Sequence, residues 1–235
     1  MRGKTKAKAV ARARRRGKPG QQMGLSLQKK FGHGGARKNA GRKSASGMSP
    51  VARTKRPLLS ANHPVHVNWR VLPHVWNLRS RRGFRVILRA LAASAQRTAV
   101  RVTHFSVMGN HVHLIVEADG TAALSRGMQG IAIRLAKGLN KMMEGRHGKV
   151  FADRYHAHPL SNPTETRNAI AYVMNNARVH AERQGRSGPR GDDEYAVGPE
   201  QLVARKTLWR RLSAWGPPVV APSSWLLTAG WRLAK

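Results

Sequence analysis

Hydrophobic and polar residues alternate along three short stretches of the chain, which predicts three β-strands. Residues 64–71 alternate with a period of two, as expected for a strand with one buried face. The same interpretation applies to residues 100–108 and 111–117. Gly109 and Asn110 lie between the second and third stretches, and this pair of turn residues predicts a hairpin.

Longer stretches with helical spacing separate and follow these strands. Apolar residues recur every three or four positions over residues 78–97 and again over residues 121–143. Residues 150–160 predict a loop and a short strand. A third helix is expected from Asn162 to about residue 184, because an N-cap candidate, a proline and a glutamate follow in that order. The order β-α-β-β-α-β with one more helix predicts an α+β, ferredoxin-like sheet with an additional C-terminal helix.

Both ends of the chain lack this pattern. Residues 1–60 hold 18 lysines and arginines but almost no aromatic or β-branched residues, so we expect a disordered basic arm. Residues 61–184 are expected to form the folded domain. Residues 185–235 predict a linker and a C-terminal extension that is rich in tryptophan, at Trp209, Trp215, Trp225 and Trp231.

The charge of the chain points to a class of partner. The 235 residues include 44 lysines and arginines but only 10 aspartates and glutamates, a formal net charge of +34, and the first acidic residue is Glu117. So uneven a charge predicts a polyanionic partner, most commonly nucleic acid. The absence of cysteine excludes disulfides, zinc–cysteine sites and thiol nucleophiles. No apolar run approaches the length of a membrane-spanning helix, so we expect no membrane partner and a cytoplasmic, nucleoid-associated location.

Two histidines lie on one face of the third predicted strand. His111 and His113 are two residues apart, so their side chains point the same way while Val112 and Leu114 point toward the core. Neutral imidazoles in such a pair can chelate a divalent cation. The pair alone is weak support for a metal site, because the chain has 11 histidines.

The sequence around these histidines resembles a known motif. Residues 107–116, Val-Met-Gly-Asn-His-Val-His-Leu-Ile-Val, are similar to the histidine-hydrophobic-histidine motif of HUH endonucleases. The version Met-x-Asn-His-Val-His-Leu resembles single-tyrosine transposases of the insertion-sequence-200 kind and their REP-associated relatives. The resemblance spans residues 63–183, and it implies the same ferredoxin-like order that the periodicity predicts.

The third helix contains the tyrosine that such a transposase requires. Residues 171–178, Ala-Tyr-Val-Met-Asn-Asn-Ala-Arg, resemble the family's Tyr-Ile-x-x-Asn-Pro segment, with valine in place of isoleucine and alanine in place of proline. The resemblance implies that Tyr172 is the nucleophile. It also implies that Asn176, on the same helical face, joins His111 and His113 as a ligand of Mg²⁺ or Mn²⁺. Without the resemblance, Tyr172 would be interpreted as a core residue and Asn176 as a helix-surface residue.

The resemblance also implies a reaction and a substrate. Proteins of this kind cleave and rejoin DNA by metal-assisted transesterification through a 5′-phosphotyrosine intermediate, and the expected partner is single-stranded or hairpin DNA. We expect four basic residues to hold the DNA backbone near the cut: Arg134, Lys137, Arg154 and Arg178. A homodimer that shares the tyrosine helix between two chains stays open.

Several alternatives stay open on the sequence alone. A non-catalytic nucleic-acid-binding protein, such as a domesticated transposase, would keep the fold without cutting. A two-histidine phosphoesterase would need two His-x-Thr or His-x-Ser motifs, a pair that this chain lacks, and a ribosomal-type RNA-binding protein would not explain the pattern around His111. Tyr155 competes with Tyr172 as the nucleophile, although it is expected to pack or to contact DNA. Tyr195 is expected to be inert, because it lies in an acidic linker without a basic partner.

Overall fold

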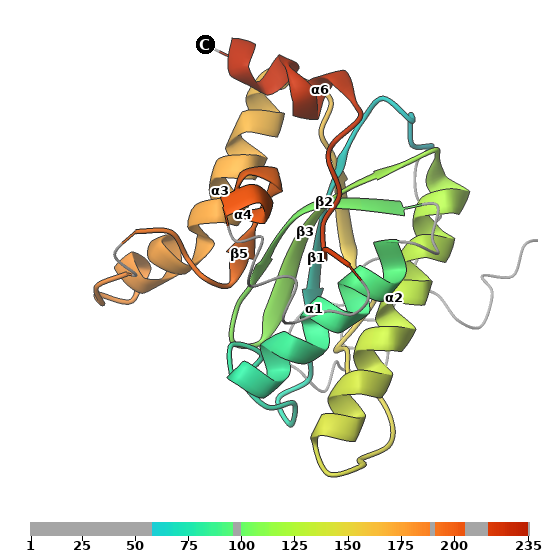
Figure 1. The fold of residues 1–235 in the computed structure, drawn as a ribbon, viewed down its shortest axis with the longest axis vertical. Helices are drawn as coiled ribbons and strands as arrows, with labels where there is room; N and C mark the ends of the chain where they lie inside the picture. Colours follow the sequence, from blue (N-terminus) through green and yellow to red (C-terminus); the bar gives the residue numbers. More distant parts are fainter. Residues whose placement is uncertain (1–57, 96–99, 189–190, 205–215, 235) are drawn as a thin grey trace, which may run out of the picture. The chain divides into compact units, whose positions relative to one another are not determined.

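The strands of the protein form one five-stranded sheet with helices on both faces (Figure 1). The computed structural model describes residues 58–95, 100–188, 191–204 and 216–234. The strands are β1 (Val65–Arg70), β2 (Val100–Val107), β3 (His111–Ala118), β4 (His156–Pro159) and β5 (Ala196–Val197). Their order in the sheet is β4-β1-β3-β2-β5, and every neighbouring pair is antiparallel. Strand β3, which carries the paired histidines, therefore lies at the centre of the sheet.

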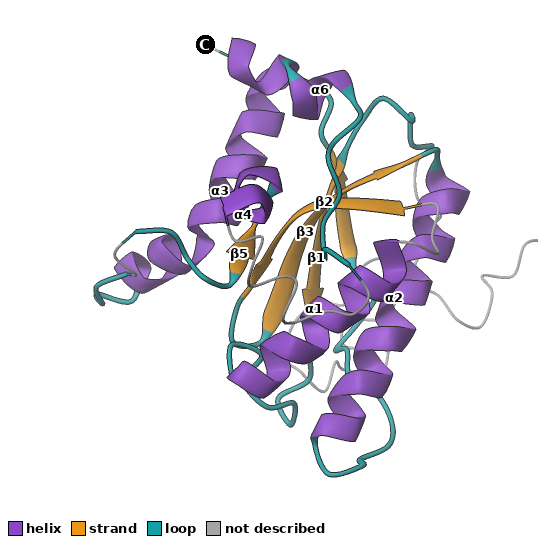
Figure 2. Ribbon diagram, viewed as in Figure 1, coloured by secondary structure: helices purple, strands orange, loops and turns teal. Residues whose placement is uncertain are grey.

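The helices alternate with the strands in the predicted order (Figure 2). They are α1 (Arg81–Ala95), α2 (Thr121–Met142), α3 (Pro163–Arg183), α4 (Pro199–Ala204), α6 (Trp225–Thr228) and the 3₁₀ helix η1 (Gly230–Leu233). The order β1-α1-β2-β3-α2-β4 is the ferredoxin-like order, and α3 is the additional helix. The fold class predicted from the sequence is therefore confirmed.

The start of α3 follows directly from its sequence. The side chain of Asn162 accepts a hydrogen bond from the backbone N–H of Glu165 at 2.9 Å, and Pro163 occupies the first turn. The carboxylate of Glu165 accepts the backbone N–H of Ser161 at 2.8 Å. This reciprocal capping satisfies N–H groups that a helix start leaves unpaired, and it fixes the residue at which α3 begins.

The two faces of β3 carry different chemistry. Val112, Leu114 and Val116 are buried in the main hydrophobic core together with residues of α1 and α2. Burying an aliphatic side chain of this size stabilises a fold by about 1.5–3 kcal/mol. On the other face, Ile115 packs with Val173 of α3 in a smaller cluster. Because side chains alternate along a strand, the histidines of β3 share this second face with α3, while α1 and α2 cover the opposite face.

The segment after α3 contributes a strand that the sequence pattern did not predict. Ala196 and Val197 form β5 and pair with Ser106 and Phe105 of β2. A two-residue strand carries too few positions to establish a period, so the segment 185–200 was interpreted as a linker.

Tyr195 has a basic partner, so the prediction that it lacks one is wrong. The guanidinium carbon of Arg79 lies 4.1 Å from the centre of the Tyr195 ring. The same guanidinium donates two hydrogen bonds, of 2.7 and 2.8 Å, to the carboxylate of Asp193. Arg79 precedes α1 and the two partners follow α3, so only the folded sheet brings them together.

The C-terminal extension folds back onto the sheet and onto α3. The backbone N–H of Val220 donates to the carbonyl of Val102 at 2.9 Å, and Leu227 of α6 packs with Val173 of α3. The carboxylate of Glu117 accepts the backbone N–H groups of Ser223 and Ser224 at 2.7–3.0 Å. The extension is thus attached to the centre of the sheet and to the helix that carries Tyr172.

Some expectations concern residues that lie outside the described part of the chain. Residues 1–57 of the basic arm belong there, as do Trp209 and Trp215 of the extension. Within the described ranges, no helix is both long enough and apolar enough to cross a membrane.

Candidate active site

The paired histidines lie side by side on the α3 face of the sheet. His111 and His113 sit opposite Arg70 and Asn68 of β1 in the antiparallel pairing. Their ring centres are 4.9 Å apart, with the ring planes at 81°. His113 is 2% exposed and His111 is half-buried. Alternation along β3 therefore places both rings where α3 crosses the sheet.

Helix α3 brings the predicted tyrosine to these histidines within the same chain. The ring of Tyr172 meets the ring of His113 edge to face, with 5.3 Å between the ring centres and 87° between the planes. Asn176 follows one helical turn later and is completely buried. The earlier alternatives of a core tyrosine and a surface asparagine do not describe this arrangement, because Tyr172 is half-buried beside a histidine and Asn176 is the buried residue.

Several buried polar atoms of this site have no hydrogen-bond partner. They are Nε2 of His113, both amide atoms of Asn176 and Nε2 of His180. Leaving a buried polar group unpaired costs about 1–3 kcal/mol, so a cluster of such atoms indicates a place built for a bound group. Imidazole nitrogens and an amide oxygen suit a divalent cation. Among the described residues, no three histidine, aspartate or glutamate side chains could hold a metal by themselves, so the amide of Asn176 is needed to complete a ligand set.

The electrostatics of the site keep the histidines neutral. Burial lowers the pKa of His113 from 6.5 to about 3, and the neighbouring His111, His66 and His180 lower it further. Burial likewise lowers the pKa of His111 to about 4, with contributions from His180 and Arg70. At neutral pH both rings therefore carry an unprotonated nitrogen whose lone pair is available to a cation or a proton.

His66 of β1 belongs to the site, although the sequence analysis did not single it out. Its Nε2 lies 3.1 Å from Nδ1 of His113, and the two rings stack with 5.3 Å between their centres. The ring of His66 also lies 5.9 Å from that of Tyr172. The signal was present in the alternation over residues 64–71, which puts His66 on the polar face of its strand, but the pairing of β1 with β3 cannot be seen in the sequence.

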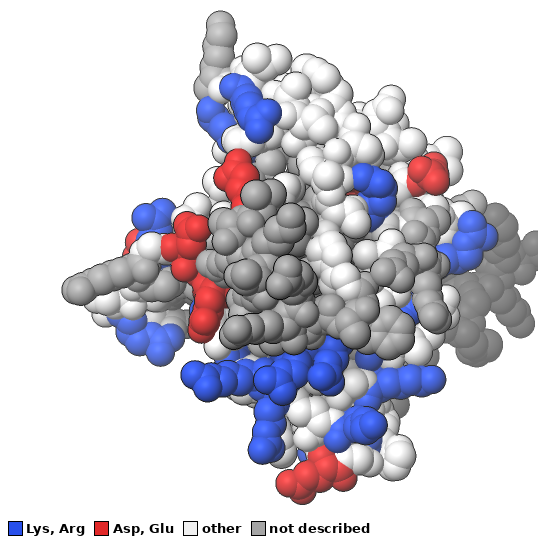
Figure 3. All heavy atoms as spheres, viewed as in Figure 1, with Lys and Arg blue, Asp and Glu red and all other residues white. Residues whose placement is uncertain are grey.

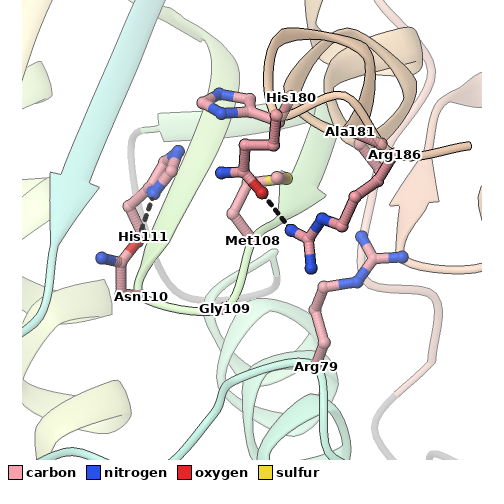
Figure 4. A pocket seen from close by; sticks show the side chains of 10 residues that line it. Arg79, Met108, Gly109, Asn110, His111, His180, Ala181 and Arg186 are labelled. Carbon is pink, nitrogen blue, oxygen red and sulfur yellow. Dashed lines mark hydrogen bonds between the residues drawn. The ribbon is translucent and has the colours of Figure 1, made fainter. Parts of the chain in front are cut away.

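A pocket of about 370 Å³ opens beside His111. His180, two helical turns after Tyr172 on α3, lines it, and its ring centre is 5.6 Å from that of His111. Figure 4 shows the side chains of Arg79 and Arg186 on the other side of the same pocket. Nδ1 of His111 is paired with the side-chain oxygen of Asn110 at 2.7 Å. The pocket thus combines a predicted metal ligand with two guanidinium groups, a combination suited to phosphate.

The four predicted DNA-binding residues divide between the two faces of the protein. Arg178 is exposed on α3 and forms an ion pair of 3.9 Å with Glu182, and Arg154 is exposed just before β4. Arg134 and Lys137 belong to α2 instead, which covers the opposite face of the sheet. The structure therefore does not bring Arg134 and Lys137 to Tyr172.

Tyr155 packs in the hydrophobic core. It is 7% exposed, and its ring meets that of Trp69 edge to face at 5.6 Å. Trp69 alternates with His66 and Asn68 along β1, so its side chain lies on the face of the sheet away from the histidines. The packing role expected for Tyr155 is confirmed.

The fold and the site together define a class of protein. A ferredoxin-like sheet with paired histidines on its central strand, facing a tyrosine on an added helix, is the arrangement of HUH-type single-tyrosine transposases. Residues 74–176 match the sequence model of a family described as IS200-like transposases. The chain thus contains an IS200-like transposase domain, which gives it an enzymatic role in DNA transposition. The matched range includes His111, His113, Tyr172 and Asn176, whereas His66 and His180 lie outside it.

Solved structures share the fold. A REP-associated tyrosine transposase bound to a REP hairpin is 12% identical, with a TM-score of 0.50, and the alignment covers 77% of this chain and 97% of that chain. A bacterial tRNA(His) guanylyltransferase (Thg1)-like protein in complex with GTP is 10% identical, with a TM-score of 0.42, over 55% of this chain and 68% of that chain. No curated protein sequence matches this chain.

Proposed function

We propose that the protein cleaves and rejoins single-stranded DNA by transesterification, with Tyr172 as the nucleophile. The observation that carries this proposal is the position of Tyr172, which lies against His113 beside buried donor atoms that have no partner. A core tyrosine would not need such neighbours. A nucleophilic tyrosine does, because the phosphate that it attacks must be held and its charge offset.

The residues present fit a divalent cation. His111, Nε2 of His113 and the side-chain oxygen of Asn176 would hold Mg²⁺ or Mn²⁺. A bound cation would polarise the scissile phosphate and offset charge on its oxygens. The unpaired amide of Asn176 and the unpaired Nε2 of His113 support this assignment, since both lose a desolvation cost when a ligand arrives.

The reaction exchanges one phosphodiester for another. The phenolic oxygen of Tyr172 forms a bond to phosphorus while the bond from phosphorus to the 3′ oxygen breaks. The tyrosine proton is lost, and the 3′ oxygen gains a proton and leaves as a free 3′-OH. The 5′-phosphotyrosine keeps the bond energy, so attack by another 3′-OH rejoins DNA and restores the tyrosine without ATP.

His66 would set the orientation of His113. If Nδ1–H of His113 donates to Nε2 of His66, the lone pair of His113 lies on Nε2, toward the proposed cation. Histidines that bind metals commonly donate their other ring N–H to a fixed acceptor in this way. We therefore treat His66 as a positioning residue that acts through His113.

Arg154 and Arg178 are proposed to contact the DNA backbone on the tyrosine side of the sheet. The substrate would be single-stranded or hairpin DNA, in keeping with the hairpin bound by the structurally similar REP-associated transposase. A DNA substrate implies a cytoplasmic, nucleoid-associated location. One chain supplies both Tyr172 and the histidines, so the proposed reaction does not require a homodimer.

A covalent-adduct experiment tests the proposal. Labelled single-stranded DNA with a hairpin is incubated with the protein and Mn²⁺, and a denaturing gel is inspected for a protein–DNA adduct. We expect an adduct with the native chain and with Tyr155→Phe, and none with Tyr172→Phe. DNA binding without an adduct, with any hairpin and any divalent cation, would instead favour a non-catalytic DNA-binding protein.

A further inference from the structure

A second cationic surface lies between α1 and α2, on the face of the sheet away from α3. The two helices enclose a groove of about 640 Å³. Six basic side chains line it: Arg82, Arg85, Arg89, Arg134, Lys137 and Lys141. We call these six residues and the space between them the α1–α2 groove. Figure 3 shows lysine and arginine side chains gathered over α1 and the adjoining part of α2.

The basic residues of the α1–α2 groove form two parallel rows. On α1 they follow the spacing i, i+3, i+7 from Arg82, and on α2 they follow the same spacing from Arg134. Residues at this spacing share one helical face, and each row spans about 10 Å along its helix. The rows are thus carried on rigid elements that fix the spacing of the charges.

The floor of the groove is apolar and brings the two rows close together. It is formed by Val86, Ala90, Ala93, Gly138 and Met142. A Cβ atom at Gly138 would lie 2.6 Å from Cγ1 of Val86, so the helices pack more closely here than any larger residue would allow. The absence of a side chain at 138 therefore sets the width of the groove.

These charges have no acidic counterpart in the described part of the chain. The ion pairs found there join Arg79 to Asp193, Arg101 to Glu117 and Arg178 to Glu182, and none of the groove residues takes part. Neither aspartate nor glutamate lines the groove. Six like charges on two adjacent helices repel each other, and a polyanion would offset that repulsion.

We infer that the α1–α2 groove binds the sugar–phosphate backbone of a double-stranded DNA stem. This inference rests on the proposed function, because it assigns a second part of the same substrate. Sites for single strands combine cations with aromatic rings on which bases stack, and no aromatic residue lines this groove. Two rigid rows of cations over an apolar floor suit phosphates that are held at regular spacing, as in a duplex.

The inference gives Arg134 and Lys137 a role that their location allows. They cannot hold the scissile phosphate, because the sheet separates α2 from Tyr172. In the groove they would hold the stem while the single-stranded extension passes around one edge of the sheet to Tyr172. The stem and the cut would thus be read on opposite faces of one domain.

Paired charge-neutralising variants of the full chain test this inference. The groove variant is Arg85→Gln with Lys137→Gln. The control is Arg81→Gln with Arg126→Gln, which removes the same charge from exposed positions of the same two helices outside the groove lining. Binding is measured over a range of salt concentrations with a DNA hairpin that carries a single-stranded extension, and with an unpaired strand of equal length.

We expect the groove variant to bind the hairpin about tenfold more weakly than the control does, because two charge-assisted phosphate contacts are lost. The slope of the logarithm of the binding constant against the logarithm of salt concentration should fall by about two. Binding of the unpaired strand should change equally in both variants. Equal losses of hairpin affinity in both variants, or an equal loss for the unpaired strand in the groove variant, would overturn the inference.

The adduct assay keeps this test separate from the test of the proposed function. The groove variant should still form the tyrosine adduct at a saturating concentration of hairpin DNA. If the native chain forms no adduct, the proposed chemistry fails while the binding comparison can still be read. If the groove variant binds normally and forms the adduct, only the assignment of the stem to the groove fails.

Discussion

At the scale of single residues, the site consists of a row of aromatic side chains that runs from β1 to α3. His66 contacts His113, and His113 contacts Tyr172. Each contact is made across secondary-structure elements, and the order of the row determines which nitrogen of His113 is left without a partner. The chemistry proposed for Tyr172 therefore depends on a residue that neither the sequence pattern nor the family match points out.

Substitution of His66 tests this dependence. His66→Leu removes the acceptor for Nδ1–H of His113, so we expect the ring to lose its fixed tautomer and Mn²⁺ affinity to fall about 10–100-fold. His66→Gln places an amide near the position of Nε2 and should retain affinity within a few-fold. Calorimetry measures the affinity, and long-range ¹H–¹⁵N NMR of the metal-free protein reports the tautomer of His113. Native-like affinity and an unchanged tautomer in His66→Leu would mean that His66 plays no positioning role.

The sequence predicted the chemistry-bearing residues that local spacing can establish. His111 and His113 follow from alternation along one strand, and Tyr172 and Asn176 follow from spacing along one helix. His66 and His180 were missed because each joins the site only through another element. His66 does so through the pairing of β1 with β3, and His180 through the packing of α3 on the sheet.

At the scale of elements, the C-terminal extension supports the helix that carries the tyrosine. Glu117 is 4% exposed at the end of β3 and accepts hydrogen bonds from Ser223 and Ser224, just before α6. Burial raises the pKa of Glu117, but the hydrogen bonds from Ser224 and Ser223 outweigh burial and hold this pKa below its ordinary value. The carboxylate is therefore charged when it anchors the extension.

Substitution of this anchor should loosen the extension. Glu117→Gln replaces one acceptor oxygen by a donor group that faces backbone N–H groups, so the free energy of unfolding should fall by about 1–3 kcal/mol. Amide hydrogens of α6 should exchange faster than in the native chain. Glu200→Gln, at an exposed position of α4, serves as the control. Unchanged exchange in α6 with Glu117→Gln would show that the extension is held by other contacts.

The elements themselves were predictable to different degrees. The hairpin and α3 follow from local signals, namely a Gly-Asn turn and an Asn-Pro-x-Glu cap. Strand β5 and the extension could not be predicted, because they are stabilised by partners far away in the sequence. Val197 pairs with Phe105, and Ser223 and Ser224 are held by Glu117.

At the scale of the whole molecule, the sheet separates two kinds of surface. The α3 face holds the histidines and Tyr172, and the α1–α2 face holds the cationic groove. The net charge of +34 therefore has a spatial order that composition alone does not reveal. Buried histidines on the sheet also make the stability of the whole domain depend on pH.

His104 provides a test of this pH dependence away from the proposed metal ligands. Burial lowers its pKa from 6.5 to about 4, although the nearby Glu117 opposes the shift. Between these two pH values the unfolded chain binds a proton that the folded protein does not, so the free energy of unfolding falls as the pH decreases. Above pH 6.5 this contribution is constant.

His104→Gln should therefore reduce the loss of stability on acidification. The reduction is at most about 1.4 kcal/mol per pH unit, the value for one proton. Chemical denaturation at a series of pH values measures it, with the exposed His74→Gln as the control. A native-like acid loss in His104→Gln would show that other groups cause the dependence.

The most direct test of the proposed chemistry locates the covalent bond. The chain has 3 tyrosines, and cleavage after lysine and arginine places them on separate peptides, residues 155–167, 168–178 and 191–205. After reaction with hairpin DNA and Mn²⁺, the protein is digested with nuclease and trypsin and analysed by mass spectrometry. The account predicts a nucleotide remnant on Tyr172 in peptide 168–178. A remnant on Tyr155 or Tyr195, with peptide 168–178 unmodified, would contradict it.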